Sequence, residues 1–116
     1  MPSNKSKGDL VQGTLDMLIL RTLKRDAMHG FGIAKSIEDR SDDVLRVEEG
    51  SLYPALYRLE VQGLVKSEWG HAATGHRAKY YRLTSAGRKR LTAEQASWSR
   101  MVDAIARVMD PAEEPG

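Results

Sequence analysis

The stretch Gly50-Ser51-Leu52-Tyr53-Pro54-Ala55-Leu56-Tyr57-Arg58-Leu59-Glu60 predicts a short helix with sharply defined ends. We expect Ser51 to be the N-cap, because its hydroxyl can accept a hydrogen bond from a free backbone N–H. Pro54 is expected in the first turn, where a missing N–H costs nothing. Gly63 follows at the position where a left-handed residue commonly ends a helix.

The predicted helix has two different faces. Leucines 52, 56 and 59 recur at helical spacing and form an apolar stripe for the core, whereas Tyr53, Tyr57 and Arg58 point away from it. Such a helix is suited to recognition. It is equally compatible with an ordinary amphipathic helix whose tyrosines cover the edges of the core.

The residues after this helix favour recognition. Val65–Trp69 alternates apolar and polar side chains, residues 70–75 form a loop bounded by glycines, and Arg77–Leu83 is a basic, aromatic strand. The order helix, strand, loop, strand is typical of a winged helix-turn-helix, in which the helix enters the major groove and the hairpin lies beside it. The expected fold is therefore mainly α with a small β-hairpin.

These motifs resemble those of the PadR-like transcriptional regulators. The resemblance covers roughly residues 10 to 90 and is specific in combination. It rests on Gly30-Phe31-Gly32-Ile33, on residues 50–56, on Arg58-Leu59-Glu60 continuing to Gly63-Leu64-Val65, and on Tyr80-Tyr81-Arg82-Leu83-Thr84 with Gly87. It implies a dimeric winged helix that represses transcription.

Composition narrows the class of protein. A chain of 116 residues is expected to form one domain, and its small core makes dimerisation a plausible source of further burial. The chain has no cysteine, which excludes disulfides and thiolate metal sites and suits a reducing cytoplasm. Neither a signal-peptide segment nor an apolar run of bilayer length is present, so we expect a cytoplasmic protein without a membrane partner.

The net charge of +2 conceals a segregation of charge. Between Arg77 and Arg90 every charged residue is basic, whereas the segments 26–43 and 91–116 are net acidic. A local basic patch beside a recognition helix attracts the phosphate backbone of double-stranded DNA. The alternative is a solvated charged surface, which the sequence would favour if the helix-turn-helix pattern were absent.

The remaining segments are predicted to support this domain. Asp9 and Gln12 are expected to cap a first helix over residues 10–25, residues 28–30 to form a turn, and residues 31–39 to form a second helix. The expected organisation is an N-terminal arm at 1–9, a winged helix-turn-helix at 10–83, a dimerisation helix at 84–109 and a disordered tail at 110–116.

The last helix is expected to begin at the N-cap Thr84 and to carry a heptad-like seam at Trp98, Val102, Ile105 and Met109. At 1.5 Å per residue it would be roughly 37 Å long, so part of its seam needs a partner, most simply a second copy of the chain, while another part packs against the chain's own first helix. The residues assigned to the dimer interface are Leu15, Leu18, Trp98, Met101, Val102, Ile105 and Met109.

Trp98 allows two interpretations. A large aromatic residue at the centre of a seam is most often a dimer contact. The sharper hypothesis is a pocket between two subunits that takes a small, flat aromatic effector, an idea that relatives of this family encourage. The residues expected to line such a pocket are Leu15, Leu18, Trp98 and Met101.

No enzyme is expected. The three histidines match no zinc spacing, and no nucleophile–base set or phosphate-binding loop can be argued, so neither a cofactor nor a metal is predicted. Three functions remain: a dimeric repressor that binds a pseudo-palindromic operator, a winged-helix protein-interaction module, and a ligand-responsive sensor. The residues assigned to DNA binding are Ser51, Leu52, Tyr53, Tyr57, Arg58, His76, Arg77, Lys79 and Lys35.

Overall fold

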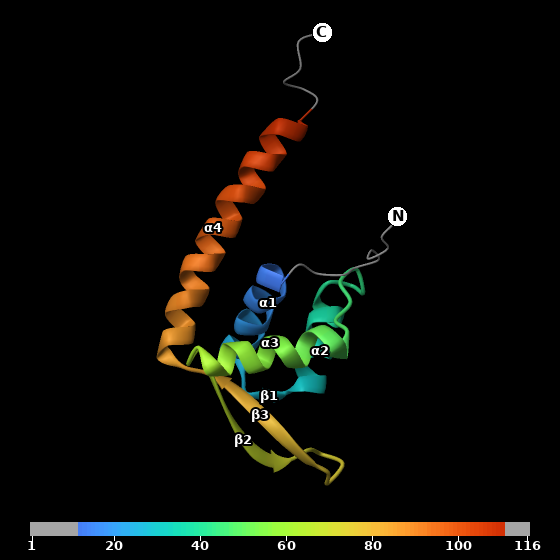
Figure 1. Cartoon of the computed structure of the whole chain (residues 1–116). Helices are drawn as coiled ribbons and strands as arrows, with labels where there is room; N and C mark the ends of the chain where they lie inside the picture. Colours follow the sequence, from blue (N-terminus) through green and yellow to red (C-terminus); the bar gives the residue numbers. More distant parts are fainter. Residues whose placement is uncertain (1–11, 111–116) are drawn as a thin grey trace.

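Helices and strands follow the predicted order in the computed structural model, which describes residues 12–110 (Figure 1). The expected winged helix-turn-helix with a long C-terminal helix is confirmed. The predicted arm at 1–9 and most of the predicted tail lie outside the described residues, as does the proposed cap Asp9. The elements are α1 (Gln12–Arg25), β1 (Met28–His29), α2 (Gly30–Arg40), α3 (Glu49–Val61), β2 (Val65–His71), β3 (Arg77–Leu83) and α4 (Ser85–Met109).

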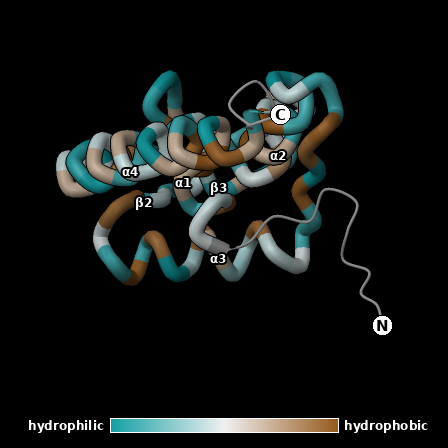
Figure 2. The backbone as a smooth tube through the Cα atoms, turned by 90° about the horizontal axis from the view of Figure 1, so that it is seen from above, coloured by the Kyte–Doolittle hydropathy of each residue, from teal (hydrophilic) through white to brown (hydrophobic). Residues whose placement is uncertain are grey.

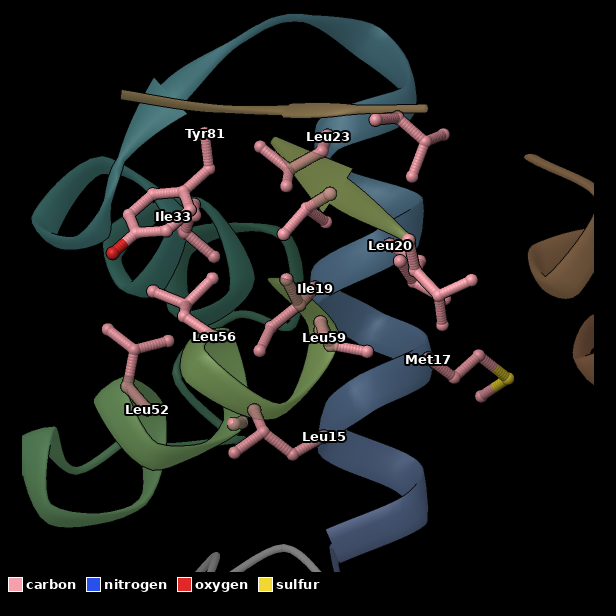
Figure 3. Close-up of a cluster of buried hydrophobic side chains, with 14 of the residues drawn as sticks. Leu15, Met17, Ile19, Leu20, Leu23, Ile33, Leu52, Leu56, Leu59 and Tyr81 are labelled. Atoms are coloured by element: carbon pink, nitrogen blue, oxygen red, sulfur yellow. The ribbon is translucent and has the colours of Figure 1, made fainter. Parts of the chain in front are cut away.

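The core lies where α1, α2 and α3 meet the base of the hairpin. Figure 3 shows leucines of α3 pointing toward Ile19 on α1, with Ile33 of α2 and Tyr81 of β3 closing the cluster. Met17 points to the side of α1 where α4 passes (Figure 3). Because α1 is apolar on more than one side, it is buried by its own domain from both directions.

The three strands form one antiparallel sheet in the order β1-β3-β2. Val65 pairs with Leu83 at the base of the hairpin, and His71 pairs with Arg77 near its tip. The short strand β1 adds Met28 and His29 to the free edge of β3. The sequence predicted only a turn there, because two residues are too few to show an alternating pattern.

The ends of α3 differ in part from the prediction. Its N-cap is Glu48 rather than Ser51, so Ser51 lies inside the first turn and Pro54 lies in the second. The backbone amides of Ser51 and Leu52 both donate to the Glu48 carbonyl. Gly63 is confirmed as the left-handed residue that ends the helix, with φ of +76°.

The long helix α4 departs from the body of the protein (Figure 1). Thr84 is its N-cap, as predicted, and accepts a hydrogen bond of 3.0 Å from the amide of Gly87. Only the first turns of α4 are buried, at Gly87 and Leu91. The rest extends outward and gives the molecule principal extents of 62 × 33 × 25 Å.

Candidate nucleic-acid interface

The exposed side of α3 carries the two tyrosines that were predicted to bind DNA. Tyr53 and Tyr57 are exposed, and so is Ser51, which is consistent with the assignment of these residues to DNA binding. Leu52 is only 1% exposed and belongs to the core, so its assignment was wrong. It lies in the same apolar stripe as Leu56, and a side chain in that stripe cannot reach a base.

Tyr53 rests against the start of α2. Gly30 is buried there, and a side chain at this position would have its Cβ only 2.6 Å from the Tyr53 hydroxyl oxygen and 2.8 Å from its ring. The absence of a side chain at Gly30 therefore gives the tyrosine ring its place. This contact gives a physical reason why Gly30 and Tyr53, which lie in two separate stretches of the sequence pattern described above, occur together.

Arg58 is turned toward the protein rather than toward solvent. Its guanidinium forms an ion pair of 2.9 Å with the carboxylate of Asp16 on α1, and both side chains are partly buried, at 32% and 24% exposed. Burial raises the pKa of Asp16, and the charge and hydrogen bond of Arg58 oppose that rise without cancelling it. The assignment of Arg58 to DNA binding was therefore wrong, because this residue fixes α3 against α1.

The wing presents two cations that were predicted to bind DNA beside the ring of Trp69, which was not among the predicted DNA-binding residues. The guanidinium carbon of Arg77 lies 4.5 Å from the centroid of the Trp69 ring, and the Lys79 ammonium lies 5.9 Å from it. Trp69 and Lys79 are direct cross-strand partners. The signal that could have revealed this cluster is strand alternation, which places 69, 77 and 79 on one face of the hairpin.

The α2 segment and the wing border one open groove with a volume of about 1070 Å³, and Tyr53 is the residue of α3 that lines it. The start of α2 and the Tyr53 ring form one wall, and the Trp69 cluster forms the other. Lys35 also lines the groove, where it pairs with Asp39 at 3.4 Å. His76 is exposed at the hairpin loop, as expected. The structure thus brings Lys35, Tyr53, Arg77 and Lys79 together, from three separate elements of the chain, α2, α3 and β3.

The basic stretch 77–90 is not a single surface. Arg82 lies on the opposite face of the hairpin from Arg77 and forms an exposed ion pair of 3.7 Å with Glu68. Arg90, at the start of α4, is close enough to lower the pKa of Asp16 on α1. Only the part of the stretch nearest the wing tip therefore contributes to the groove.

His29 has a structural role. Its Nδ1 accepts a hydrogen bond of 3.0 Å from the Gly32 amide and so caps α2, while its ring packs edge-on against Tyr80 at 5.3 Å between centroids. The sequence assigned no role to this histidine. A histidine is not among the common N-cap residues, so the sequence carried no clear signal.

A family model of transcriptional regulators, described as the PadR-like family, matches residues 19–93. This chain belongs to the PadR-like family. It is 34% identical over 89 residues to a transcriptional regulator of Mycobacterium tuberculosis, an alignment that covers 77% of this chain and 76% of the relative. Two solved structures are also similar over most of their length.

The first of these structures is a transcriptional regulator from Clostridium thermocellum, with a TM-score of 0.78 and 30% identity over 88% of this chain and 99% of that one. The second is a PadR family transcriptional regulator from Eggerthella lenta, with a TM-score of 0.72 and 35% identity over 86% and 85% of the two chains. Our PadR-like protein is therefore a DNA-binding transcriptional regulator and not an enzyme.

The outer half of α4 in this PadR-like protein carries an uncovered apolar face. Trp98 is 50% exposed, and Met101, Val102, Ile105 and Met109 are exposed with it. Brown, hydrophobic segments recur along this helix in Figure 2. Leu18 on α1 is half-buried against the core.

Leu15 was wrongly assigned to the dimer interface and to an effector pocket. It is only 3% exposed and packs inside the core of its own chain (Figure 3). The aromatic effector stays a prediction of the sequence, now without one of its four expected contacts. Among residues 12–110, no cluster of histidine and acidic side chains could hold a metal ion, and no helix is long and apolar enough to cross a membrane.

Proposed function

We propose that this protein is a dimeric repressor that binds a pseudo-palindromic operator, with one α3 and one wing for each half-site. The groove between α2 and the wing, which Tyr53 of α3 also lines, is the observation that carries the proposal. One of its walls presents the exposed Tyr53, and the other presents two cations held on Trp69. Positive charge on one wall, with a side chain of the recognition helix on the other, suits the backbone of a duplex whose base edges face α3.

The two parts of the groove have different tasks in this proposal. Tyr53, Tyr57 and Ser51 face the major groove, where hydroxyl groups can reach base edges or phosphates. Arg77, Lys79 and His76 contact the backbone or the minor groove beside the wing, and Lys35 adds a further phosphate contact from α2. Contacts of the second kind add affinity without much sequence preference.

The exposed face of α4 supports the dimeric part of the proposal. Nothing within residues 12–110 covers the apolar face of this projecting helix, and a second copy is the simplest partner. A two-fold axis would then relate the two recognition helices. Half-sites about 34–36 Å apart would place both helices in successive major grooves on one side of the DNA.

Selection from a randomised duplex library, followed by gel shifts on the enriched sequence, tests the function directly. We expect a site with two-fold symmetry and a Tyr53→Ala variant that binds it much more weakly than the parent chain does. If Tyr53→Ala binds as tightly as the parent, α3 is not the recognition helix. Enrichment of no sequence at all would contradict sequence-specific binding and favour a protein-interaction module.

The wing is tested by its dependence on salt. Replacing both Arg77 and Lys79 by Ala should weaken binding to all duplexes alike and lower the slope of log K against log salt by about 2. Replacing Arg100 and Arg107 by Ala is the matched control, because it removes the same charge from exposed positions on α4. A slope that both double variants change equally would mean that net charge, and not the wing, sets the salt dependence.

A further inference from the structure

The outward side of α3 is apolar, although it faces solvent in the single chain. Gly50, Pro54, Tyr57 and Val61 follow at spacings of four, three and four, so they lie along one side of the helix. All four are exposed, with Tyr57 at 70% and Val61 at 68%. The opposite side carries the leucines of the core. A surface helix normally presents polar residues to solvent, so a second apolar side calls for a partner.

Long side chains that read bases by paired hydrogen bonds are missing from this outward strip. Arginine reads guanine, and asparagine or glutamine reads adenine, through two hydrogen bonds at once. Within Glu49–Val61 the sequence has no lysine, asparagine or glutamine, and its single arginine, Arg58, is held by Asp16 at 2.9 Å. Besides carbon atoms, the helix can therefore offer base edges two tyrosine hydroxyls, one serine hydroxyl and the exposed Glu49 carboxylate, whereas the Glu60 carboxylate accepts a hydrogen bond from Ser67.

Thymine is the base whose major-groove edge carries a carbon group, the 5-methyl. We propose that the strip Gly50, Pro54, Tyr57 and Val61 recognises thymine methyl groups and that this contact sets much of the operator specificity. The inference rests on the proposed binding mode of α3.

Two features of the strip match a DNA duplex as its occupant. A side chain at Gly50 would meet no atom within 4 Å, so the backbone there is open to a close approach by base edges. The cations of the wing border the same groove as Tyr53, and Tyr53 is adjacent in α3 to Pro54 of the strip. Positive charge beside an apolar strip suits methyl groups flanked by phosphates better than it suits the apolar surface of another protein.

The test replaces each thymine of the selected operator, one at a time, by deoxyuridine, which lacks only the methyl group. At one or more positions in each half-site we expect binding about threefold to fivefold weaker, the effect of losing one buried methyl contact. Replacing each guanine by 7-deazaguanine, which removes the N7 acceptor, should leave binding by α3 unchanged.

A protein variant assigns the contact. Val61→Ala should bind the thymine operator more weakly and should lose the difference between thymine and deoxyuridine at the position that Val61 covers. Gly13→Ala, in α1 and with no atom within 4 Å of the added methyl, is the control that should keep every difference. Thermal unfolding and sedimentation of each variant check that fold and oligomeric state are intact.

Two results separate this inference from the proposed function. A tightly bound operator whose affinity changes with no deoxyuridine substitution, or falls only with 7-deazaguanine, overturns the recognition of thymine and leaves the repressor proposal standing. A Val61→Ala variant that loses its dimer rather than its operator preference also overturns it, because the strip would then face a second chain. If no duplex is selected, both proposals fail.

Discussion

Gly87 shows how one missing side chain sets the direction of α4. It is the third residue of that helix, and a methyl group there would collide with the backbone carbonyl of Leu64 and crowd the side chain of Leu83. Thr84 ties the start of α4 to the segment before β2, since its amide donates to the Leu64 carbonyl and its hydroxyl donates to the Gly63 carbonyl. The close approach of α4 to the hairpin thus depends on a glycine.

We predict that Gly87→Ala lowers the free energy of unfolding by about 1–3 kcal/mol, the usual cost of overpacking against a rigid backbone group. Gly13→Ala is the matched control, because it makes the same change in the first turn of α1 where the new methyl meets nothing within 4 Å. The control should be neutral or stabilising by about 0.5–1 kcal/mol. Urea denaturation of both variants measures the difference, and equal effects would contradict the collision.

Gly30→Ala should separate binding from stability. The added methyl would displace the Tyr53 ring, and because this ring is half-exposed it can swing away at little cost in folding. We therefore expect an operator affinity nearly as low as that of Tyr53→Ala, with a change in the free energy of unfolding below about 1 kcal/mol. Gly32→Ala, whose methyl would make only ordinary contacts, should bind like the parent. Normal binding by Gly30→Ala would exclude Tyr53 as a positioned contact.

Asp16 makes stability depend on pH. Its carboxyl has an ordinary pKa of 3.8 in the unfolded chain and a raised pKa in the folded protein, chiefly because of burial. The folded state thus holds the proton more tightly, and the contribution of Asp16 to stability falls as the pH rises from 3.8 through the raised value. Asp16→Asn should remove this decrease, which urea midpoints measured from pH 3.5 to 7 can show. A parent and variant with parallel pH profiles would contradict it.

At the residue scale, the sequence predicted two of the three helix caps that it assigned within residues 12–110, Ser51 being the exception, and it missed the contacts between residues far apart in the chain. Thr84 and Gly63 were predicted correctly because a helix cap involves neighbours within a few positions. Arg58 was misassigned because its partner lies 42 residues away, on a helix whose relative position no local pattern reveals. Leu52 was assigned both to the apolar core and to DNA binding, and its burial in the folded chain decides for the core.

At the scale of elements, the wing depends on Trp69 to place its cations. Trp69→Leu should leave Arg77 and Lys79 charged but free to move, and the lost cation–π contacts correspond to binding about twofold to fivefold weaker on every duplex. Its salt slope should stay that of the parent, because the number of phosphate contacts is unchanged. A reduced slope would show that Trp69 decides whether the cations bind phosphate at all.

Helices and hairpin were predictable because their apolar periods are long and their turns carry glycine. The two-residue strand β1 was not, because its pairing with β3 is a tertiary contact. The groove was predictable only in its parts: the tyrosines, the cations and Lys35 could be named from the sequence, whereas Trp69 entered only when strand register placed it opposite Lys79. The pairing register of a hairpin is set by the conformation of its loop, and a shift of one residue would place Trp69 on the other face.

At the scale of the whole molecule, α4 is a long helix that projects from the domain with its apolar side exposed (Figures 1 and 2). In the part of the chain that the structure describes, the buried core includes no residue beyond Leu91, so the outer half of α4 contributes nothing to this core. A single chain would leave Trp98 and Ile105 half-exposed, which is costly in water. In the proposed dimer these apolar side chains would be buried against the second subunit.

A chain truncated after Ala96 should therefore be a folded monomer, with cooperative unfolding by circular dichroism and a monomeric sedimentation coefficient. In the full chain, Trp98→Ala should weaken the dimer by about 3–5 kcal/mol if the ring is fully buried between subunits. Arg107→Ala, on the opposite side of α4 by helical spacing, should leave the dimer intact. Operator affinity should fall with the dimer in the Trp98 variant, because only a fixed pair of recognition helices can occupy both half-sites. A truncated chain that remains a dimer would place the main interface elsewhere, and α4 would then need another partner.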